Sequence, residues 1–86
     1  MHRDEIGRRI KSYLEKEHPQ RGAQLTETMD LMEDWFTDSL DVVKAVLFLE
    51  KEFGIRLSSG DMNAAAFRNV STLAELVASR LLRTEG

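Results

Sequence analysis

The sequence predicts an all-α protein: a small four-helix bundle of three longer helices and one short helix, with a long connection between the first and second helices. Three observations support this fold class. Hydrophobic residues recur at spacings of three and four along three long stretches, which is the period of a helix with one buried face. Residues that start or end helices flank these stretches. The 86 residues contain no internal repeat, so we expect one domain spanning residues 1–86.

The first helix is expected from Asp4 to Glu17. Pro19 ends it, because a proline pushes the residue before it out of the helical conformation. Charged residues at the remaining positions indicate a face turned to water. The hydrophobic positions expected to face the core are Ile6, Ile10, Tyr13 and Leu14.

Residues Gln20 to Thr37 form a connection that is longer than most loops in compact domains. It is too hydrophobic for a free linker, so we expect it to lie across the bundle and pin it. A short helical turn is expected from about Thr28 to Met32. Trp35 and Phe36 are expected in the core or in a lid over it rather than in a ligand site. The hydrophobic residues of the connection are Leu25, Met29, Leu31, Met32, Trp35 and Phe36.

The motif Asp38-Ser39-Leu40-Asp41 opens the main helix, which continues through a hydrophobic stretch to Phe53. Asp38 is a good N-cap, because its carboxylate can accept from the backbone N–H groups of the first turn. Gly54 is a natural stop, since glycine tolerates the left-handed conformation that ends many helices. The Ser39 hydroxyl is therefore predicted at a helix N-terminus, where N–H groups and the helix dipole favour an attached or bound phosphate.

The main helix has three predicted surfaces. The inward surface follows steps of four, three and four and consists of Val42, Val46, Leu49 and Phe53. A flanking stripe that can be partly exposed consists of Leu40, Val43 and Leu47. The far side, expected to face water, consists of Asp41, Lys44, Phe48, Lys51 and Glu52.

Two helices are expected in the last third of the chain. Asp61 is a candidate N-cap for a short third helix from Met62 to Phe67, whose three alanines favour helix and permit close packing. Thr72 and Glu75 form a capping-box pattern at the start of the last helix. That helix is expected to fray over the last four residues. Its core positions are Leu73, Leu76, Val77 and Leu81.

Composition and motif content exclude several function classes. The formal charge of −3, with both signs interspersed, disfavours a nucleic-acid surface. Without cysteine there is no disulfide, thiolate nucleophile or cysteine metal site, and the positions of His2 and His18 disfavour a histidine metal site. No hydrophobic run reaches the length of a membrane span and the N-terminus is not a signal peptide, so we expect a cytoplasmic protein. The sequence contains no glycine-rich phosphate loop, no paired carboxylates at catalytic spacing and no serine–histidine constellation, which predicts that the protein is not an enzyme.

The motif Asp38-Ser39-Leu40-Asp41, the helix ending Glu50-Lys51-Glu52-Phe53-Gly54-Ile55 and the chain length together resemble the acyl carrier protein family, which includes peptidyl and aminoacyl carriers. The resemblance covers nearly the whole chain. It implies a 4′-phosphopantetheine arm, taken from coenzyme A and attached covalently to Ser39 by a phosphopantetheinyl transferase. Asp38 would cap the helix and help the transferase hold its metal, and Leu40 would contact the arm.

The resemblance also implies partners and a cargo. A monomeric carrier would receive acyl or aminoacyl groups from a loading ligase or transferase and pass them to biosynthetic enzymes. The main helix would dock these partners through Asp41, Val43, Lys44, Leu47, Phe48 and Lys51. The cargo stays open between fatty acyl groups and the aminoacyl or other groups of specialised metabolism, because Lys44 and Lys51 stand where many fatty-acid carriers have acids.

Two further points stay open at the level of sequence. The family usually has a glycine one or two places before its Asp-Ser-Leu, where this chain has Phe36 and Thr37, so the turn geometry there is not predicted. A second class of function is a helical adaptor without a cofactor, which would bind a partner helix through the stripe Leu40, Val43 and Leu47. A mass increase by one phosphopantetheine distinguishes the carrier from the adaptor.

Overall fold

A computed structural model describes residues 2–18 and 25–85, the last three by their backbone only. The described residues form α1 (Arg3–Glu17), α2 (Leu31–Asp34), α3 (Ser39–Phe53) and α4 (Val70–Glu85), with no strand among them. The predicted fold class is confirmed: three longer helices and one short helix form a small all-α bundle, with a long connection after the first helix.

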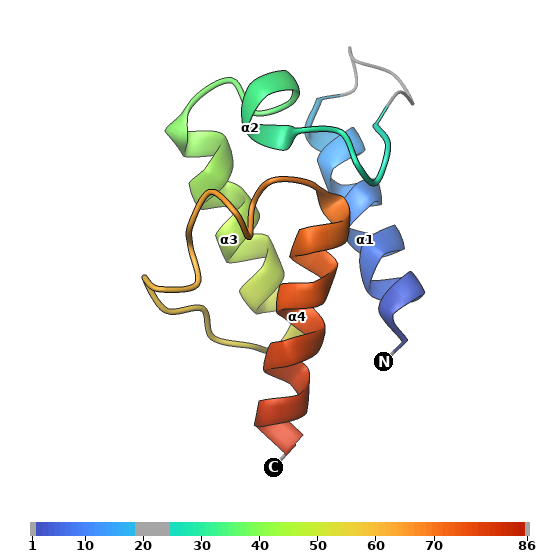
Figure 1. Ribbon diagram of the computed structural model, residues 1–86, viewed down its shortest axis with the longest axis vertical. Helices are drawn as coiled ribbons and strands as arrows, with labels where there is room; N and C mark the ends of the chain where they lie inside the picture. The colour runs from blue at the N-terminus through green and yellow to red at the C-terminus, as the bar shows by residue number, and fades with distance from the viewer. Residues whose placement is uncertain (1, 19–24, 86) are drawn as a thin grey trace.

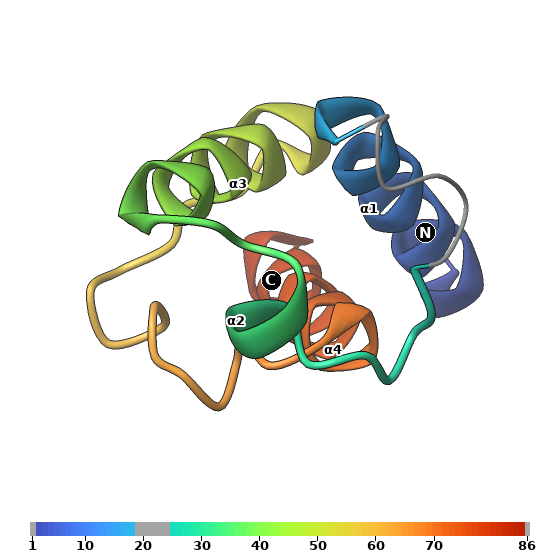
Figure 2. The same cartoon turned by 90° about the horizontal axis from the view of Figure 1, so that it is seen from above.

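The three longer helices surround a common interior (Figures 1 and 2). The short helix α2 lies across one end of this interior, and the loop of residues 54–69 closes the side between α3 and α4. Both ends of the chain lie at the end opposite α2 (Figure 1). The largest fully buried side chains come from the four helices and from the connection between α1 and α3: Trp35, Ile6, Ile10, Leu25, Leu31, Leu49, Leu73, Val70 and Val77.

Helix α1 follows its predicted pattern closely. It begins one residue earlier than expected, because the His2 ring accepts from the Asp4 N–H at 3.2 Å and acts as the N-cap. It ends at Glu17, as predicted, while Pro19 lies outside the described residues. Gly7 faces α4, where a Cβ atom would make only an ordinary van der Waals contact at 3.9 Å from the Ala74 Cβ. The predicted core residues Ile6, Ile10 and Leu14 are buried, and Tyr13 is half-buried.

The connection between α1 and α3 pins the bundle as predicted, with one exception. Leu25, Leu31 and Trp35 are buried, and Met29 and Phe36 pack against the core. Met32 was expected in this group but is 46% exposed, so that expectation is wrong. The reason is the register of the short helix: it starts at Leu31 rather than at about Thr28, and this turns the next residue outward.

The position of α2 has a local cause. Asp30 caps it by accepting from the Glu33 N–H at 3.1 Å. The Leu31 N–H donates to the carbonyl of Arg68 at 2.7 Å, which ties the short helix to the loop before α4. The buried Leu31 side chain and this hydrogen bond together fix where the connection crosses the bundle.

The predicted short helix from Met62 to Phe67 is wrong, because these residues form turns. Asn63 is the cause: its side-chain oxygen accepts from the Ala66 N–H at 2.9 Å, and its amide donates to the Gly60 carbonyl at 3.0 Å. Asparagine side chains often compete with helix in this way. Ala64 and Ala65 are exposed, so these two alanines gain no burial that would support the helix their propensity favours.

The start of α4 is also corrected. The predicted capping box joined Thr72 to Glu75, but the helix begins at Val70 and its box joins Asn69 to Thr72. The Thr72 N–H donates to the Asn69 side chain at 2.8 Å, and the Asn69 N–H donates to the Thr72 hydroxyl at 3.1 Å. The helix backbone continues to Glu85, beyond the point at which fraying was expected.

Asp61 has a different partner from the one predicted. Instead of capping a following helix, its carboxylate accepts from the N–H and hydroxyl of Ser58 at 2.9 and 3.0 Å and pairs with Arg80 of α4. The Ser58 N–H, and after it the Arg80 guanidinium, lowers the pKa of Asp61. Asp61 thereby links the loop of residues 54–69 to the last helix.

We expect this link to make stability depend on acid pH. A depressed folded-state pKa adds stability that is fully present above the unfolded value of about 4 and is lost as pH falls through the folded value. Wild-type protein should therefore lose more unfolding free energy between about pH 5 and pH 3 than Asp61→Asn does. Urea titrations at the two pH values measure this difference. Equal losses in the two proteins would show that Asp61 contributes no such linkage.

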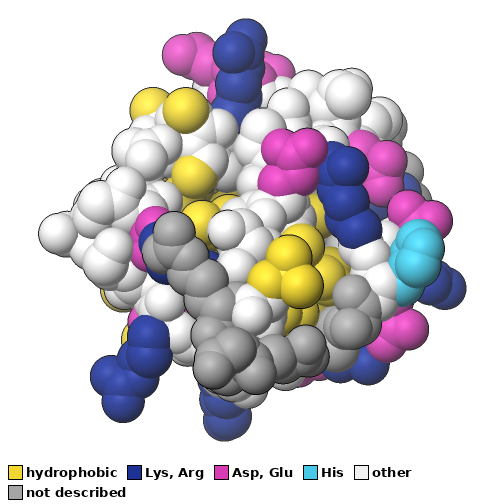
Figure 3. Space-filling view, turned by 60° about the horizontal axis from the view of Figure 1, so that its bottom comes forward, with side chains coloured by type: hydrophobic (Ala, Val, Ile, Leu, Met, Phe, Trp, Pro, Cys, Tyr) yellow, Lys and Arg dark blue, Asp and Glu magenta, His cyan; other side chains and the backbone are white. Residues whose placement is uncertain are grey.

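The surface carries charges of both signs. Figure 3 shows Lys and Arg side chains interspersed with Asp and Glu side chains over one face, with hydrophobic groups between them. Ion pairs such as Arg3–Glu75 at 2.9 Å join α1 to α4 on the surface. This mixture agrees with the pattern in the sequence and gives this face no large region of one sign.

Candidate functional site

Ser39 is the first residue of α3, and its side chain is exposed. The N-cap is Asp38, as predicted, and its extended backbone (φ −155°, ψ 179°) leads the chain directly into the helix. Its carboxylate accepts from the Asp41 N–H at 3.2 Å. At the other end, Gly54 adopts the left-handed conformation with φ 65°, which confirms it as the stop.

The surroundings of Ser39 are open to a ligand. Its hydroxyl makes no hydrogen bond with any residue that the structure describes. The N–H groups of the first helical turn have no acceptor within the helix, and only that of Asp41 is taken by the cap. The N–H groups of Ser39 and Leu40 and the positive end of the helix dipole can therefore stabilise a phosphate bonded to this serine.

Asp41 lies differently from the expectation that it faces water. Its Oδ2 atom accepts from the Thr37 N–H at 2.8 Å and from the Thr37 hydroxyl at 2.7 Å. The same oxygen lies 3.5 Å from Nε2 of His18, the residue that follows α1. The Thr37 N–H, and next its hydroxyl, lowers the pKa of Asp41. The side chain is only 16% exposed, so Asp41 is a structural acid of the loop before α3.

The flanking stripe of α3 is exposed, as predicted. Leu40, Val43 and Leu47 are 56%, 51% and 59% exposed. Lys44 and Lys51 are also exposed on this helix. A shallow hollow of about 520 Å³ adjoins the stripe, and its lining consists of Leu47, Glu50, Lys51, Gly54, Ile55 and Arg56. We name the exposed stripe with its two lysines the α3 outer face.

The inward face of α3 is rotated from the prediction. Leu49 and Phe53 are buried as expected, but Val42 and Val46 are only half-buried. Ala45, which was not predicted, is buried at 3% exposure. The centre of the buried face therefore lies nearer to Ala45, and two of the residues predicted on the far side, Phe48 and Glu52, turn toward α1.

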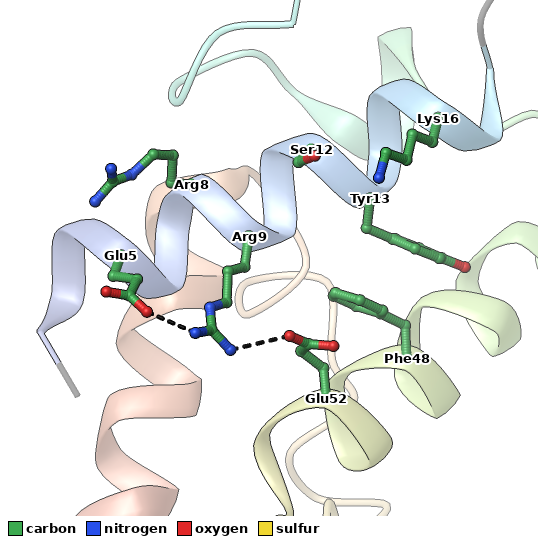
Figure 4. A pocket seen from close by; sticks show the side chains of 8 residues that line it. All are labelled: Glu5, Arg8, Arg9, Ser12, Tyr13, Lys16, Phe48 and Glu52. Carbon is green, nitrogen blue, oxygen red and sulfur yellow. Dashed lines mark hydrogen bonds and ion pairs between the residues drawn. The ribbon is translucent and has the colours of Figure 1, made fainter.

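Phe48 shows the consequence of this rotation. It was expected on the water-facing side near the docking surface, and that placement is wrong. Its ring stacks on Tyr13 of α1 with centroids 4.0 Å apart and planes 9° apart (Figure 4). Burial, and then the charges of Glu17 and Asp41, raises the pKa of Tyr13.

Glu52 also turns toward α1. It pairs with Arg9 at 3.0 Å, and Arg9 pairs in turn with Glu5 at 2.6 Å (Figure 4). These contacts line an open groove of about 530 Å³ between α1 and α3. Phe48 and Glu52 therefore join two helices, and neither belongs to the α3 outer face.

Comparison with known proteins shows the family to which the chain belongs. Residues 8–78 match the family model described as "Phosphopantetheine attachment site". The chain is 32% identical to an acyl carrier protein of Thermotoga maritima over 75 residues, which cover 87% of this chain and 86% of the relative. The chain belongs to the acyl carrier protein family.

Two further relatives agree with this assignment. The chain is 40% identical over 62 residues to an acyl carrier protein of Saccharopolyspora erythraea, covering 72% of this chain and 65% of the relative. It is 34% identical over 59 residues to polyketide-8 synthase acyl carrier protein 2 of Streptomyces avermitilis, covering 69% and 66%. As a family member, the protein has acyl carrier function and uses 4′-phosphopantetheine as its cofactor.

The described residues fit this cofactor. An exposed serine whose oxygen makes no hydrogen bond stands at a helix N-terminus with N–H groups to spare. The hydrophobic side chain of Leu40, the next residue, is also exposed. None of the described helices is long and hydrophobic enough to cross a bilayer.

The sequence indicated the serine, its cap and the outer face, but it did not indicate two contacts. The bonds between Thr37 and Asp41 join a residue before the N-cap to a residue in the first turn of α3, and the helical periodicity of the sequence does not extend to Thr37. The stack of Phe48 on Tyr13 depends on how α1 and α3 cross. One signal in the sequence indicates that the loop before Ser39 is unusual: Phe36 and Thr37 stand where the family usually has a glycine.

Proposed function

We propose that Ser39 carries the 4′-phosphopantetheine arm and that the thiol of the arm holds acyl or aminoacyl intermediates as thioesters. The observation that carries this proposal is the exposed hydroxyl at the first position of a helix capped by Asp38. The arm supplies the reactive thiol, which this cysteine-free chain lacks. The chain itself supplies a presented hydroxyl and a surface for partner enzymes. Within the proposal, Leu40 contacts the arm.

Attachment requires a phosphopantetheinyl transferase as partner, with coenzyme A as donor. The Ser39 oxygen forms a bond to the phosphorus that carries pantetheine, and the pyrophosphate bond of coenzyme A breaks. Adenosine 3′,5′-bisphosphate leaves, and the serine proton passes to a base of the transferase. The carboxylates beside Ser39 are occupied, Asp38 by the Asp41 N–H and Asp41 by Thr37. We therefore propose that this chain is a substrate of the reaction and not an enzyme.

Intact-mass spectrometry tests the proposal directly. Purified protein is incubated with coenzyme A, Mg²⁺ and a transferase, and its mass is compared before and after. We expect an increase of one phosphopantetheine per chain, located on the peptide that contains Ser39. A helical adaptor without cofactor would keep its mass, and the carrier proposal would then be wrong.

The cargo is proposed only as a class. The polyketide synthase carrier among the relatives and the lysines of the α3 outer face favour an acyl group of specialised metabolism, loaded by a dedicated ligase or transferase. Fatty acyl and aminoacyl groups are the alternatives. We propose a single-domain carrier that acts as a monomer in the cytoplasm, with Val43, Lys44, Leu47 and Lys51 as docking residues.

The two lysines lead to a prediction about partner choice. Enzymes that serve strongly acidic carriers present basic patches, and like charges repel across such an interface. Changing Lys44 and Lys51 together to glutamate should therefore speed loading by a generic malonyl transferase. Because exposed charge pairs are weak, we expect a gain of about two- to tenfold at low salt. Transfer rates at low and high salt measure this gain.

For the cognate loading enzyme we expect the opposite change in loading rate. Its surface should complement the lysines, so the double variant should be loaded more slowly by it. Both effects should shrink at high salt, since screening weakens surface charges. Unchanged or slower loading by the generic enzyme would place the lysines outside the docking surface.

A further inference from the structure

Hydrogen bonds join the loop before Ser39 to the first turn of α3. The Asp41 carboxylate holds Thr37 through two donors, the backbone N–H at 2.8 Å and the hydroxyl at 2.7 Å. In the other direction, the Asp41 N–H donates to the Asp38 carboxylate at 3.2 Å. These bonds close the segment of residues 37–41 around Ser39. We name this arrangement the Thr37–Asp41 clasp.

The clasp goes beyond an ordinary helix cap. In a capping box, the third helical residue returns its side chain to the N–H of the N-cap itself. Asp41 instead reaches one residue further, to Thr37, and one oxygen accepts from both donors. Hydrogen bonds to a carboxylate are among the stronger ones in proteins. The Asp41 side chain is thus bound to its own chain and is not displayed to a partner.

Thr37 makes this arrangement possible without a glycine. No described residue other than Gly54 has a positive φ, so the loop before Ser39 needs no left-handed conformation. Phe36 packs against the core and holds the preceding end of the loop. The backbone next to Ser39 is therefore fixed by Phe36 and Thr37 before it and by Asp41 after it.

We propose that Asp41 and Thr37 are positioning residues for phosphopantetheine transfer, which fix the backbone around Ser39 and keep its hydroxyl presented to the transferase. This inference rests on the proposed attachment at Ser39. The Ser39 side chain has no hydrogen bond of its own within the described residues, so its direction depends on the backbone that bears it. A preformed backbone lowers the cost of ordering the serine in the transferase complex.

Substitutions at Thr37 test the clasp without changing any charge. Thr37→Val keeps the shape and the backbone N–H but removes the hydroxyl. We expect kcat/KM for phosphopantetheine transfer to fall about tenfold, within the range allowed by one hydrogen bond to a charged group. Most of the fall should be in kcat, because orientation of Ser39 is lost rather than docking. Thr37→Ser keeps the hydroxyl and should restore the rate, and Thr28→Val makes the same change at an exposed threonine outside the clasp.

Asp41 distinguishes positioning from docking. If Asp41 is a positioning residue, Asp41→Ala should slow transfer equally at low salt and at about 1 M salt, where charges more than roughly 3 Å apart are screened from each other. The double variant with Thr37→Val should be no slower than Asp41→Ala alone, because both remove one interaction. Glu33→Ala removes an exposed acid from α2 as the charge control. Circular dichroism checks that every variant is folded.

Two results would overturn the inference and leave attachment at Ser39 intact. One is a Thr37→Val protein modified on Ser39 at the wild-type rate. The other is an Asp41→Ala defect that disappears at high salt, which would assign Asp41 to docking. A wild-type protein that is never modified on Ser39 would instead overturn the proposed function itself.

Discussion

Ser39→Ala is expected to abolish phosphopantetheine attachment completely while the protein stays folded. The substitution removes the only atom of this residue that can form the phosphodiester bond. It leaves Asp38, which makes the N-cap, and the buried face of α3 unchanged. The cost in unfolding free energy should be about 0.5 kcal/mol or less, as for an exposed position away from caps and core. Intact mass after incubation with coenzyme A and a transferase measures the first effect, and urea denaturation measures the second.

Ser12→Ala is the matched control for this prediction. Ser12 is also exposed and lies in a helix within the matched region, but in the middle of α1 rather than at a helix N-terminus. Its variant should gain the same mass as wild type. An arm found on Ser39→Ala protein, or on any serine other than Ser39 in wild type, would contradict the proposed site.

The fold was predictable where hydrophobic periodicity and end signals agreed. Helix α1 and helix α3 with its cap and stop were predicted within one residue for this reason. The helix predicted for residues 62–67 is wrong because it rests on the helix propensity of alanine alone. The Asn63 side chain forms hydrogen bonds with the backbone that close turns instead. Helix α4 began earlier than predicted because Asn69, rather than Thr72, is its N-cap. Both errors involve a local hydrogen bond between a side chain and the backbone: at Asn63 it competes with the helix, and at Asn69 it caps an earlier start.

The candidate site was predictable only in part. Asp38, Ser39 and Leu40 lie as the motif predicts, because a capped helix start is determined by neighbouring residues. Phe48 was placed on the wrong side, since a helical wheel cannot show which direction a neighbouring helix covers. Its partner Tyr13 is thirty-five residues earlier in the chain, and only the crossing of α1 and α3 brings the rings together. Long-range contacts of this kind leave no periodic signal in one sequence.

Phe53→Ala is expected to cause a large loss of stability. Phe53 is the last residue of α3, is 7% exposed and meets the Phe48 ring edge-on with centroids 6.2 Å apart. Removing a buried aromatic ring costs the lost burial and leaves a cavity, together about 3–5 kcal/mol. A domain of this size has a total unfolding free energy of about 4–13 kcal/mol, so this is a large share. Urea denaturation gives the difference between wild type and variant.

Leu47→Ala provides the comparison on the same helix. Leu47 is 59% exposed on the α3 outer face, so its removal should cost about 0.5 kcal/mol or less. Transfer to or from a partner enzyme should nevertheless slow, because the hydrophobic stripe is lost from the proposed docking surface. If Phe53→Ala is too unstable for a complete titration, Phe53→Leu keeps most of the volume and should cost about 1.5 kcal/mol or less. A larger stability loss for Leu47→Ala than for either Phe53 variant would mean that the buried and exposed faces of α3 are exchanged.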